Sequence, residues 1–248
     1  MKKPTNNAPL NFSTQSYPLF GRQQKPFDEK NPPQTVLSSP YYWWFMFLRL
    51  NEEYKKTCDL KGKGKYEELY EHFGDIHSIN FKEWWGEKAH LFAEKRKGYK
   101  MMIAKSENDL ASFNSDEALN LVVPLTWSQR SLKKAFTQLV LSKIEKGERG
   151  VSVEKSDAEY KLSGKWHIEA MSTAYKIYSI KKQLDEDGTK LAWADILIRA
   201  KVPMSLGLKE GAKGKLTSDA RKTLTVLADR YYKRAQKYIK NSATKSFP

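Results

Sequence analysis

The chain has 248 residues, of which 44 are Lys or Arg and 29 are Asp or Glu, so its formal net charge at pH 7 is +15. Its single cysteine, Cys58, excludes an internal disulfide, and no apolar run approaches the roughly 18 to 20 residues that span a bilayer. Because the sequence also shows no signal peptide, we expect a cytoplasmic protein with no membrane partner and a substantial core.

The first 38 residues are rich in Asn, Gln, Pro and Ser and show no apolar period. This composition predicts a flexible or extended arm over residues 1–38. Four apolar side chains are candidates to pin parts of the arm to the body: Tyr17, Leu19, Phe20 and Phe27. We expect an aromatic-rich α+β domain over 39–164 and a basic helical domain over 165–248.

Eight bulky apolar residues, YYWWFMFL, stand side by side at 41–48. A serine at 38 or 39, followed by Pro40, predicts a helix start, and this helix is expected to continue to about residue 58. Two more helices are predicted over 65–73 and 81–95. Because the block is apolar on all sides, we expect it to be the hub on which these helices pack. The alternative is that the Trp pairs at 43–44 and 84–85 stack on unpaired bases.

The pattern changes in the middle of the chain. The sequences YKMMIA (99–104) and ALNLVVPL (118–125) are strand candidates, the second of them buried, with Pro124 at a strand end or edge. Ser128 is placed to cap a helix over 129–145. A strand followed by a helix is therefore predicted here, and residues 149–162 are expected to hold one more short strand or a loop.

The C-terminal third is predicted to be helical over 167–184, 191–202 and about 217–241. Thr217 or Ser218 is expected to cap the last of these helices. The predicted fold class is accordingly mainly α with a small β element, that is, α+β.

These three helices loosely resemble a tri-helical DNA-binding domain of the helix-turn-helix kind. A linker of about fourteen residues before the last helix replaces the usual short turn, which departs from that pattern. The resemblance implies that four residues at the start of the last helix face base edges: Thr217, Arg221, Lys222 and Thr225.

The last helix separates into two faces on a helical wheel. One face is an apolar stripe made of Leu224, Leu227, Ala228, Tyr231, Ala235, Tyr238 and Ile239. Another face carries Arg230, Lys233, Arg234, Lys237 and Lys240, with Arg221 and Lys222 near the helix start. Residues 201–248 hold 12 basic and 3 acidic residues, which is most of the net charge. We predict that these seven basic residues bind a polyanion, and a solvated lysine-rich surface is the alternative.

Catalytic motifs are not found in the sequence. The turns KGKGK (61–65) and LKEGAKGK (208–215) lack the spacing of a phosphate-binding loop. His72 and His77 are spaced so that two imidazoles do not share a helical face, and no metal site is predicted. Cys58 has no identifiable base beside it and is interpreted as a small buried residue. We therefore expect no cofactor and no enzymatic activity.

Several motifs occur in a fixed order: YYWWFMFLRLNEEY, LYEHFGDI, FKEWWGEKAHLFAEK, LNLVVPLTWSQRSLKKAF and RYYKRAQKYIKN, followed by a terminal Phe-Pro. Over most of the chain from residue 40 they resemble a family of uncharacterised bacterial proteins associated with plasmids, prophages and other mobile elements. The resemblance implies a bacterial cytosol and a link to mobile DNA, and it carries no activity or site residues.

The leading hypothesis is a DNA-binding accessory or regulatory protein of a bacterial mobile element. It would contact the phosphates of nucleic acid, with DNA favoured, through its basic C-terminal helix. The alternative is a phage-like structural or assembly protein, or a subunit of a defence or counter-defence complex. In that case the N-terminal arm and aromatic surface would bind a protein partner or a second copy. An enzyme with an unrecognised site is the third hypothesis.

Overall fold

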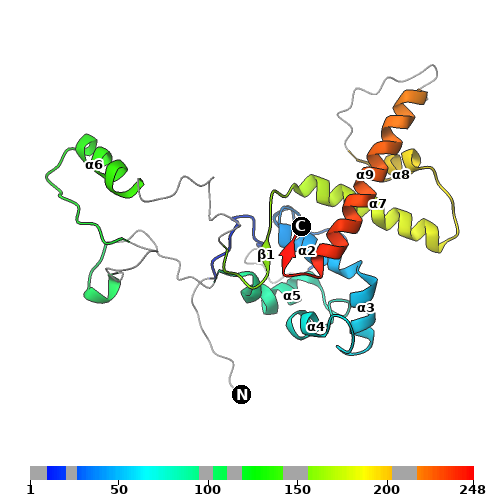
Figure 1. Cartoon of the computed structure of the whole chain (residues 1–248), viewed down its shortest axis with the longest axis horizontal. Coiled ribbons are helices and arrows are strands. Elements are labelled where there is room, and N and C mark those ends of the chain that lie inside the picture. The colour runs from blue at the N-terminus through cyan, green and yellow to red at the C-terminus, as the bar shows by residue number, and fades with distance from the viewer. Residues whose placement is uncertain (1–9, 21–26, 95–102, 111–118, 142–155, 203–216) are drawn as a thin grey trace.

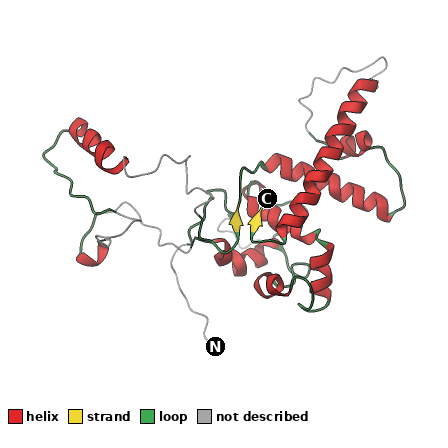
Figure 2. Ribbon diagram, viewed as in Figure 1, coloured by secondary structure: helices red, strands yellow, loops and turns green. Residues whose placement is uncertain are grey.

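The computed structural model describes residues 10–20, 27–94, 103–110, 119–141, 156–202 and 217–248. Within these ranges the protein is mostly helical and has one small parallel sheet (Figures 1 and 2), in agreement with the predicted fold class. The α-helices are α1 (Gln34–Leu37), α2 (Pro40–Arg49), α3 (Glu52–Asp59), α4 (Glu67–Phe73), α5 (Phe81–Lys88), α6 (Gln129–Phe136), α7 (Ile168–Glu186), α8 (Trp193–Arg199) and α9 (Ser218–Ser242). The remaining elements are the 3-10 turns η1 (Ala89–Phe92) and η2 (Glu107–Asp109), the π-helical turn η3 (Thr137–Leu141), and the strands β1 (Lys161–Leu162) and β2 (Ser246–Phe247).

The apolar block at 41–48 lies within α2 and forms the centre of the core. Each of its residues except Met46 is buried. Its rings meet elements on several sides: the centroid of Trp44 lies 5.2 Å from that of Phe247, and the centroid of Phe45 lies 5.0 Å from that of Trp84. The predicted hub is therefore confirmed. All four tryptophans of the pairs at 43–44 and 84–85 are buried, so these pairs belong to the core and not to a base-stacking surface.

The single helix predicted over 40–58 is in fact two helices, α2 and α3. Asn51 lies between them in an extended conformation, and its Oδ1 accepts a hydrogen bond from the backbone N of Tyr54 at 3.0 Å. Its Nδ2 donates to the carbonyl of Ile239 in α9 at 3.1 Å. An Asn side chain competes with the helix for backbone groups and favours the cap position, which explains why the helix breaks here.

The two other predicted helices of the N-terminal half are present as α4 and α5. Asn80 caps α5 by accepting a hydrogen bond from the backbone N of Glu83 at 3.1 Å. The second helix is shorter than predicted, because α5 ends at Lys88 and η1 continues the chain only to Phe92. Phe92 is fully buried and its ring stacks on Phe73 of α4 with centroids 5.6 Å apart, so this turn closes the aromatic core.

The described parts of the predicted arm are residues 10–20 and 27–38, and aromatic side chains fix them to the body. Phe20 and Phe27 pack edge to face with centroids 5.7 Å apart, and both approach Phe81 of α5. Tyr17 and Leu19 are exposed. Of the four predicted pins, Phe20 and Phe27 therefore contact the core.

The small sheet joins two segments that are far apart in the sequence. β1 and β2 are parallel, with Lys161 paired to Ser246 and Leu162 paired to Phe247. The chain's C-terminal end thus lies beside β1 and above α2 (Figure 1), and Phe247 is fully buried. β1 confirms a short strand within 149–162. One hydrophobic cluster contains residues from both sides of the predicted domain boundary at 164 and 165.

The buried strand predicted over 118–125 is wrong for its described residues. Residues 119–125 form no strand, and Val122 and Leu125 are each 92% exposed. A strand needs a partner for its backbone hydrogen bonds, and no described segment pairs with this one. In the other candidate, residues 99–102 lie outside the described ranges, and Ile103 and Ala104 are not in a strand. Ser128 caps α6 as predicted, since its Oγ accepts a hydrogen bond from the backbone N of residue 131 at 3.2 Å.

The three helices predicted for the C-terminal third are present as α7, α8 and α9. They share a second core cluster whose buried members are Ile177, Leu184, Ala194, Ile196, Leu197, Ala200, Leu224 and Ala228. The connection on which the helix-turn-helix resemblance depends includes residues 203–216, which lie outside the described ranges. The arrangement of α9 on α7 and α8 positions the candidate site.

Candidate nucleic-acid interface

Helix α9 begins and packs as its sequence predicts. Thr217 is the cap, because its Oγ1 accepts a hydrogen bond from the backbone N of Ala220 at 3.2 Å. Leu224, Ala228 and Ala235 of the predicted apolar stripe are fully buried. The helix therefore turns one fixed face toward the core and the opposite face toward solvent.

Both core clusters hold α9 in place. Its first half packs on α7 and α8, which it crosses in Figure 1, and Leu224 and Ala228 belong to the second cluster. Its second half packs on α2, where the centroid of Tyr238 lies 5.1 Å from that of Phe47. The Asn51 amide also donates to a carbonyl of this half. Because the helix is fixed at both halves, its outer face is presented as one rigid surface.

Five exposed basic residues follow one another along that outer face. We call this surface the α9 ridge, and its members are Arg230, Lys233, Arg234, Lys237 and Lys240. Four of them, Arg230, Lys233, Lys237 and Lys240, are three or four residues apart, and Arg234 lies beside them. Their side chains therefore project from neighbouring turns on the side away from the apolar stripe. Like charges at this spacing repel one another by a few tenths of a kcal/mol per pair, so an anion on the ridge would relieve an unfavourable arrangement.

Carboxylates neutralise little of the α9 ridge. Lys233 Nζ lies 2.8 Å from Asp229 Oδ2, one turn earlier. The Arg234 guanidinium lies over the ring of Tyr231, 5.6 Å from its centroid, and this contact leaves its charge uncompensated. Among the described residues, no carboxylate oxygen lies within 4.0 Å of the other three members of the ridge. The ridge thus combines five cations with one carboxylate.

The two basic residues at the start of α9 differ from each other. Arg221 donates two hydrogen bonds to Asp195 of α8, each 2.8 Å long, so its guanidinium ties the two helices together. Lys222 is exposed and lies 3.8 Å from Asp219, and it continues the ridge direction two turns before Arg230. Of the seven predicted binding residues, six therefore share the outer face, and Arg221 turns toward α8.

Lysines elsewhere in the described chain include several with carboxylate partners. Lys245 Nζ is 2.6 Å from Glu68 Oε1, and Lys182 Nζ is 3.1 Å from Glu52 Oε1. The hydrogen bond between Lys245 and Glu68 raises the pKa of the lysine and lowers the pKa of the glutamate. In these pairs a carboxylate from a distant segment neutralises the lysine. The α9 ridge, by contrast, is paired with a single carboxylate, Asp229 of its own helix.

The histidines and the cysteine do not assemble into a reactive site. His72 Nδ1 lies 2.7 Å from Tyr160 Oη and 3.3 Å from Glu159 Oε1, which links α4 to the segment before β1. Burial of Cys58 raises the pKa of its thiol to about 11, so it is protonated at neutral pH. Within the described ranges, no three His, Cys, Asp or Glu residues are grouped so as to hold a metal ion.

Comparison with known proteins gives no further constraint. Neither a scan against protein-family models nor searches of curated proteins and solved structures return a significant match to the chain. Among the described residues, no helix is both long enough and apolar enough to cross a membrane.

Proposed function

We propose that this protein binds nucleic acid, and duplex DNA in particular, through phosphate contacts along the α9 ridge. The observation that carries the proposal is the ridge itself, in which five cations and one carboxylate lie on one exposed face of a helix fixed by two core clusters. From Arg230 to Lys240 the ridge extends about 15 Å along the helix axis, a length over which duplex DNA presents roughly nine charges. Neutralising them releases counterions, which favours binding.

The contacts of α9 support backbone binding more than base readout. Arg221, expected from the helix-turn-helix resemblance to face a base edge, is held by Asp195. The hydroxyl of Thr225 donates to the Arg221 carbonyl, and Thr217 is used as the cap. Contacts to phosphates position a protein on nucleic acid without reading its sequence, so binding is expected to be largely sequence-independent.

The biological setting of this proposal is an accessory or regulatory role in a bacterial mobile element, in the cytoplasm. It rests on the sequence resemblance to plasmid- and prophage-associated proteins. The alternative, an assembly protein that binds partners or a second copy through its arm and aromatic surface, has less support. Phe20 and Phe27 of the arm already pack on the chain's own core, and the Trp pairs are buried.

The experiment is fluorescence anisotropy of a labelled generic duplex titrated with the whole protein at several salt concentrations. Five phosphate contacts predict that the logarithm of the affinity falls with the logarithm of salt with a slope of about −4 to −5. Reversing four ridge charges, with Lys233, Arg234, Lys237 and Lys240 each changed to Glu, should weaken binding by about a hundredfold or more.

The matched control reverses four exposed lysines outside α9: Lys55, Lys63, Lys165 and Lys176, each changed to Glu. Both variants change the net charge equally, so a general attraction between a basic protein and DNA would weaken equally in the two. Equal losses of affinity, or no binding by the unmodified protein at low salt, would refute the proposal.

A further inference from the structure

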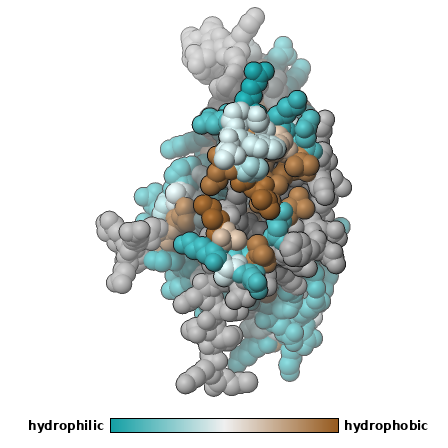
Figure 3. Space-filling model, turned by 90° about the vertical axis from the view of Figure 1, so that its left-hand side faces the viewer, coloured by the Kyte–Doolittle hydropathy of each residue, from teal (hydrophilic) through white to brown (hydrophobic). Residues whose placement is uncertain are grey.

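A second candidate binding surface, separate from α9, lies in residues 119–141. This segment carries large apolar side chains that the protein does not bury: Leu119, Leu121, Val122, Val123, Leu125, Trp127 and Leu139 are exposed. Helix α6, which it contains, has no buried residue. In Figure 1 the segment stands apart from the helices of the core, and the view from that side shows apolar residues gathered on the surface (Figure 3).

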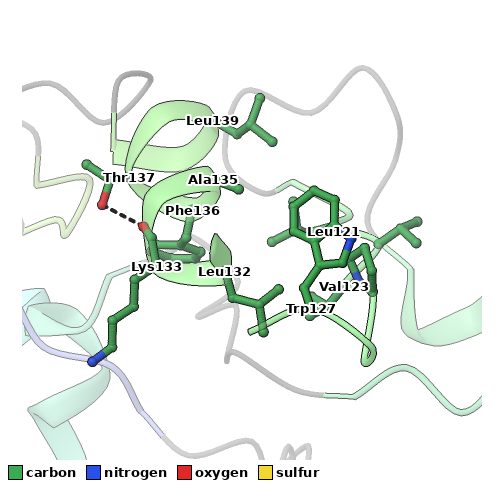
Figure 4. A pocket seen from close by; sticks show the side chains of 11 residues that line it. Leu121, Val123, Trp127, Leu132, Lys133, Ala135, Phe136, Thr137 and Leu139 are labelled. Carbon is green, nitrogen blue, oxygen red and sulfur yellow. Dashed lines mark hydrogen bonds between the residues drawn. The ribbon is translucent and has the colours of Figure 1, made fainter. Parts of the chain in front are cut away.

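Most of these apolar side chains line a shared groove. It has a volume of about 550 Å³ and lies between residues 121–127 and α6 with η3. Figure 4 shows Leu121, Val123 and Trp127 on one side and Leu132 and Leu139 on the other. Soluble proteins rarely leave a contiguous apolar surface of this kind uncovered, so it marks an interaction site.

Charge complementarity indicates what covers this surface. Residues 119–141 contain Arg130, Lys133 and Lys134 and no Asp or Glu. On the wheel of α6, Leu132 and Phe136 lie on the groove side, whereas Arg130 and Lys134 lie on the opposite side. Lys133 is among the residues that line the groove, and in Figure 4 its side chain extends outward from it. A short helix with one apolar face, and with only cations among its charged residues, fits an occupant that is apolar inside and anionic outside.

An anionic bilayer matches these features better than a protein does. Leu125 and Val122 are each 92% exposed, and Leu125 does not line the groove, so apolar side chains point in more than one direction. A protein partner would have to match each of these shapes, whereas lipid chains adapt to them. A second copy would bring another chain of net charge +15 to a cationic segment.

We propose that residues 119–141 bind the surface of an anionic phospholipid bilayer. The side chains of residues 121–125 and the apolar face of α6 enter the boundary between headgroups and acyl chains, with Trp127 at headgroup level. Arg130, Lys133 and Lys134 contact lipid phosphates. The segment lies along the membrane and does not cross it, which is compatible with the lack of a spanning helix among the described residues. This departs from the expectation of no membrane partner, which rested only on the absence of a spanning run.

The test measures flotation of the whole protein with vesicles made of equal parts phosphatidylcholine and phosphatidylglycerol, and with pure phosphatidylcholine vesicles. The parent protein carries the four α9 ridge substitutions to Glu, which removes that ridge as a source of attraction to lipid. We expect binding to the anionic vesicles, and at least about tenfold weaker binding when Val122, Leu125 and Trp127 are all changed to Ser. This variant keeps every charge, and its positions are exposed, so thermal unfolding should be unchanged.

Three results would overturn the proposal. The first is equal vesicle binding by the serine variant and its parent, which would mean electrostatic adsorption alone. The second is no binding of the parent to anionic vesicles. The third is self-association by light scattering that the serine variant loses, with no lipid binding, which would assign the surface to a second copy. The proposal does not depend on nucleic-acid binding, because the serine changes made in the unmodified protein should leave its duplex affinity unaltered.

Discussion

Two continuous apolar runs of this chain, YYWWFMFL at 41–48 and LVVPL at 121–125, lie in opposite environments. The first lies within α2 and is buried except for the half-buried Met46, and the second is largely exposed and forms no regular element. Hydrophobicity alone does not separate them. The difference lies in their neighbours, because α2 is surrounded by α5, α7, α9 and the C-terminal strand, whereas α6 buries none of its residues. An apolar run becomes core only when other elements supply complementary apolar surface and partners for its polar groups.

The largest expected effect comes from truncating one large apolar side chain in each run. Trp44 is fully buried, stacks on Phe247, and donates its indole N–H to the Ser242 carbonyl at 2.8 Å. Changing Trp44 to Ala should lower the free energy of unfolding by about 3 to 5 kcal/mol. Changing Leu125 to Ala should alter it by less than about 0.5 kcal/mol. Urea denaturation followed by circular dichroism measures both, and a large loss from Leu125→Ala would contradict the contrast.

The second prediction uses a phenol that only the buried run contains. Burial of Tyr42 raises its pKa to about 12. The folded state therefore favours the neutral phenol, and this contribution is present below pH 10 and is lost as pH rises toward 12. At pH 11 the unfolding free energy should be lower than at pH 8 by about 1.4 kcal/mol for this residue. Tyr42→Phe should reduce the pH dependence of the unfolding free energy by that amount. An unchanged pH profile in this variant would show that Tyr42 does not make this contribution.

The smallest effect compares two helix caps. Asn51 caps α3 within the core and also bonds to α9, whereas Ser128 caps α6 in the exposed segment. Asn51→Ala should lower the unfolding free energy by about 1 kcal/mol. Ser128→Ala should leave global unfolding unchanged, because α6 can lose its helix without opening the core. Comparable losses for the two variants would show that α6 unfolds together with the core.

Local signals in the sequence were reliable where one residue decides the structure. The caps at Ser128 and Thr217 are present, and the apolar stripe of α9 is buried as its spacing predicts. The cap at Asn51 was missed, because the apolar block before it looked like part of a longer helix. Its signal was available in the Asn-Glu-Glu sequence at 51–53, which is typical of a helix start.

Long-range pairings could not be read from local patterns. The ion pair between Arg221 and Asp195 joins α9 to α8 and removes one predicted binding residue from the outer face. The short strand at 246–247 pairs with 161–162, and neither segment has a strand-like pattern long enough to recognise. The strand predicted over 118–125 had the pattern but lacks a partner among the described residues.

The sequence by itself determined the helical class, the concentration of positive charge near the C-terminus, and the division of α9 into an apolar and a basic face. These depend on composition and on spacing along a helix, which are local properties. The tertiary structure decided which apolar run is covered, which arginine is held by a carboxylate, and which cations are exposed. Those outcomes depend on contacts between separate segments, which are 26 residues apart for Arg221 with Asp195 and 198 residues apart for Trp44 with Ser242. Nothing in a single segment specifies the surface that it will meet.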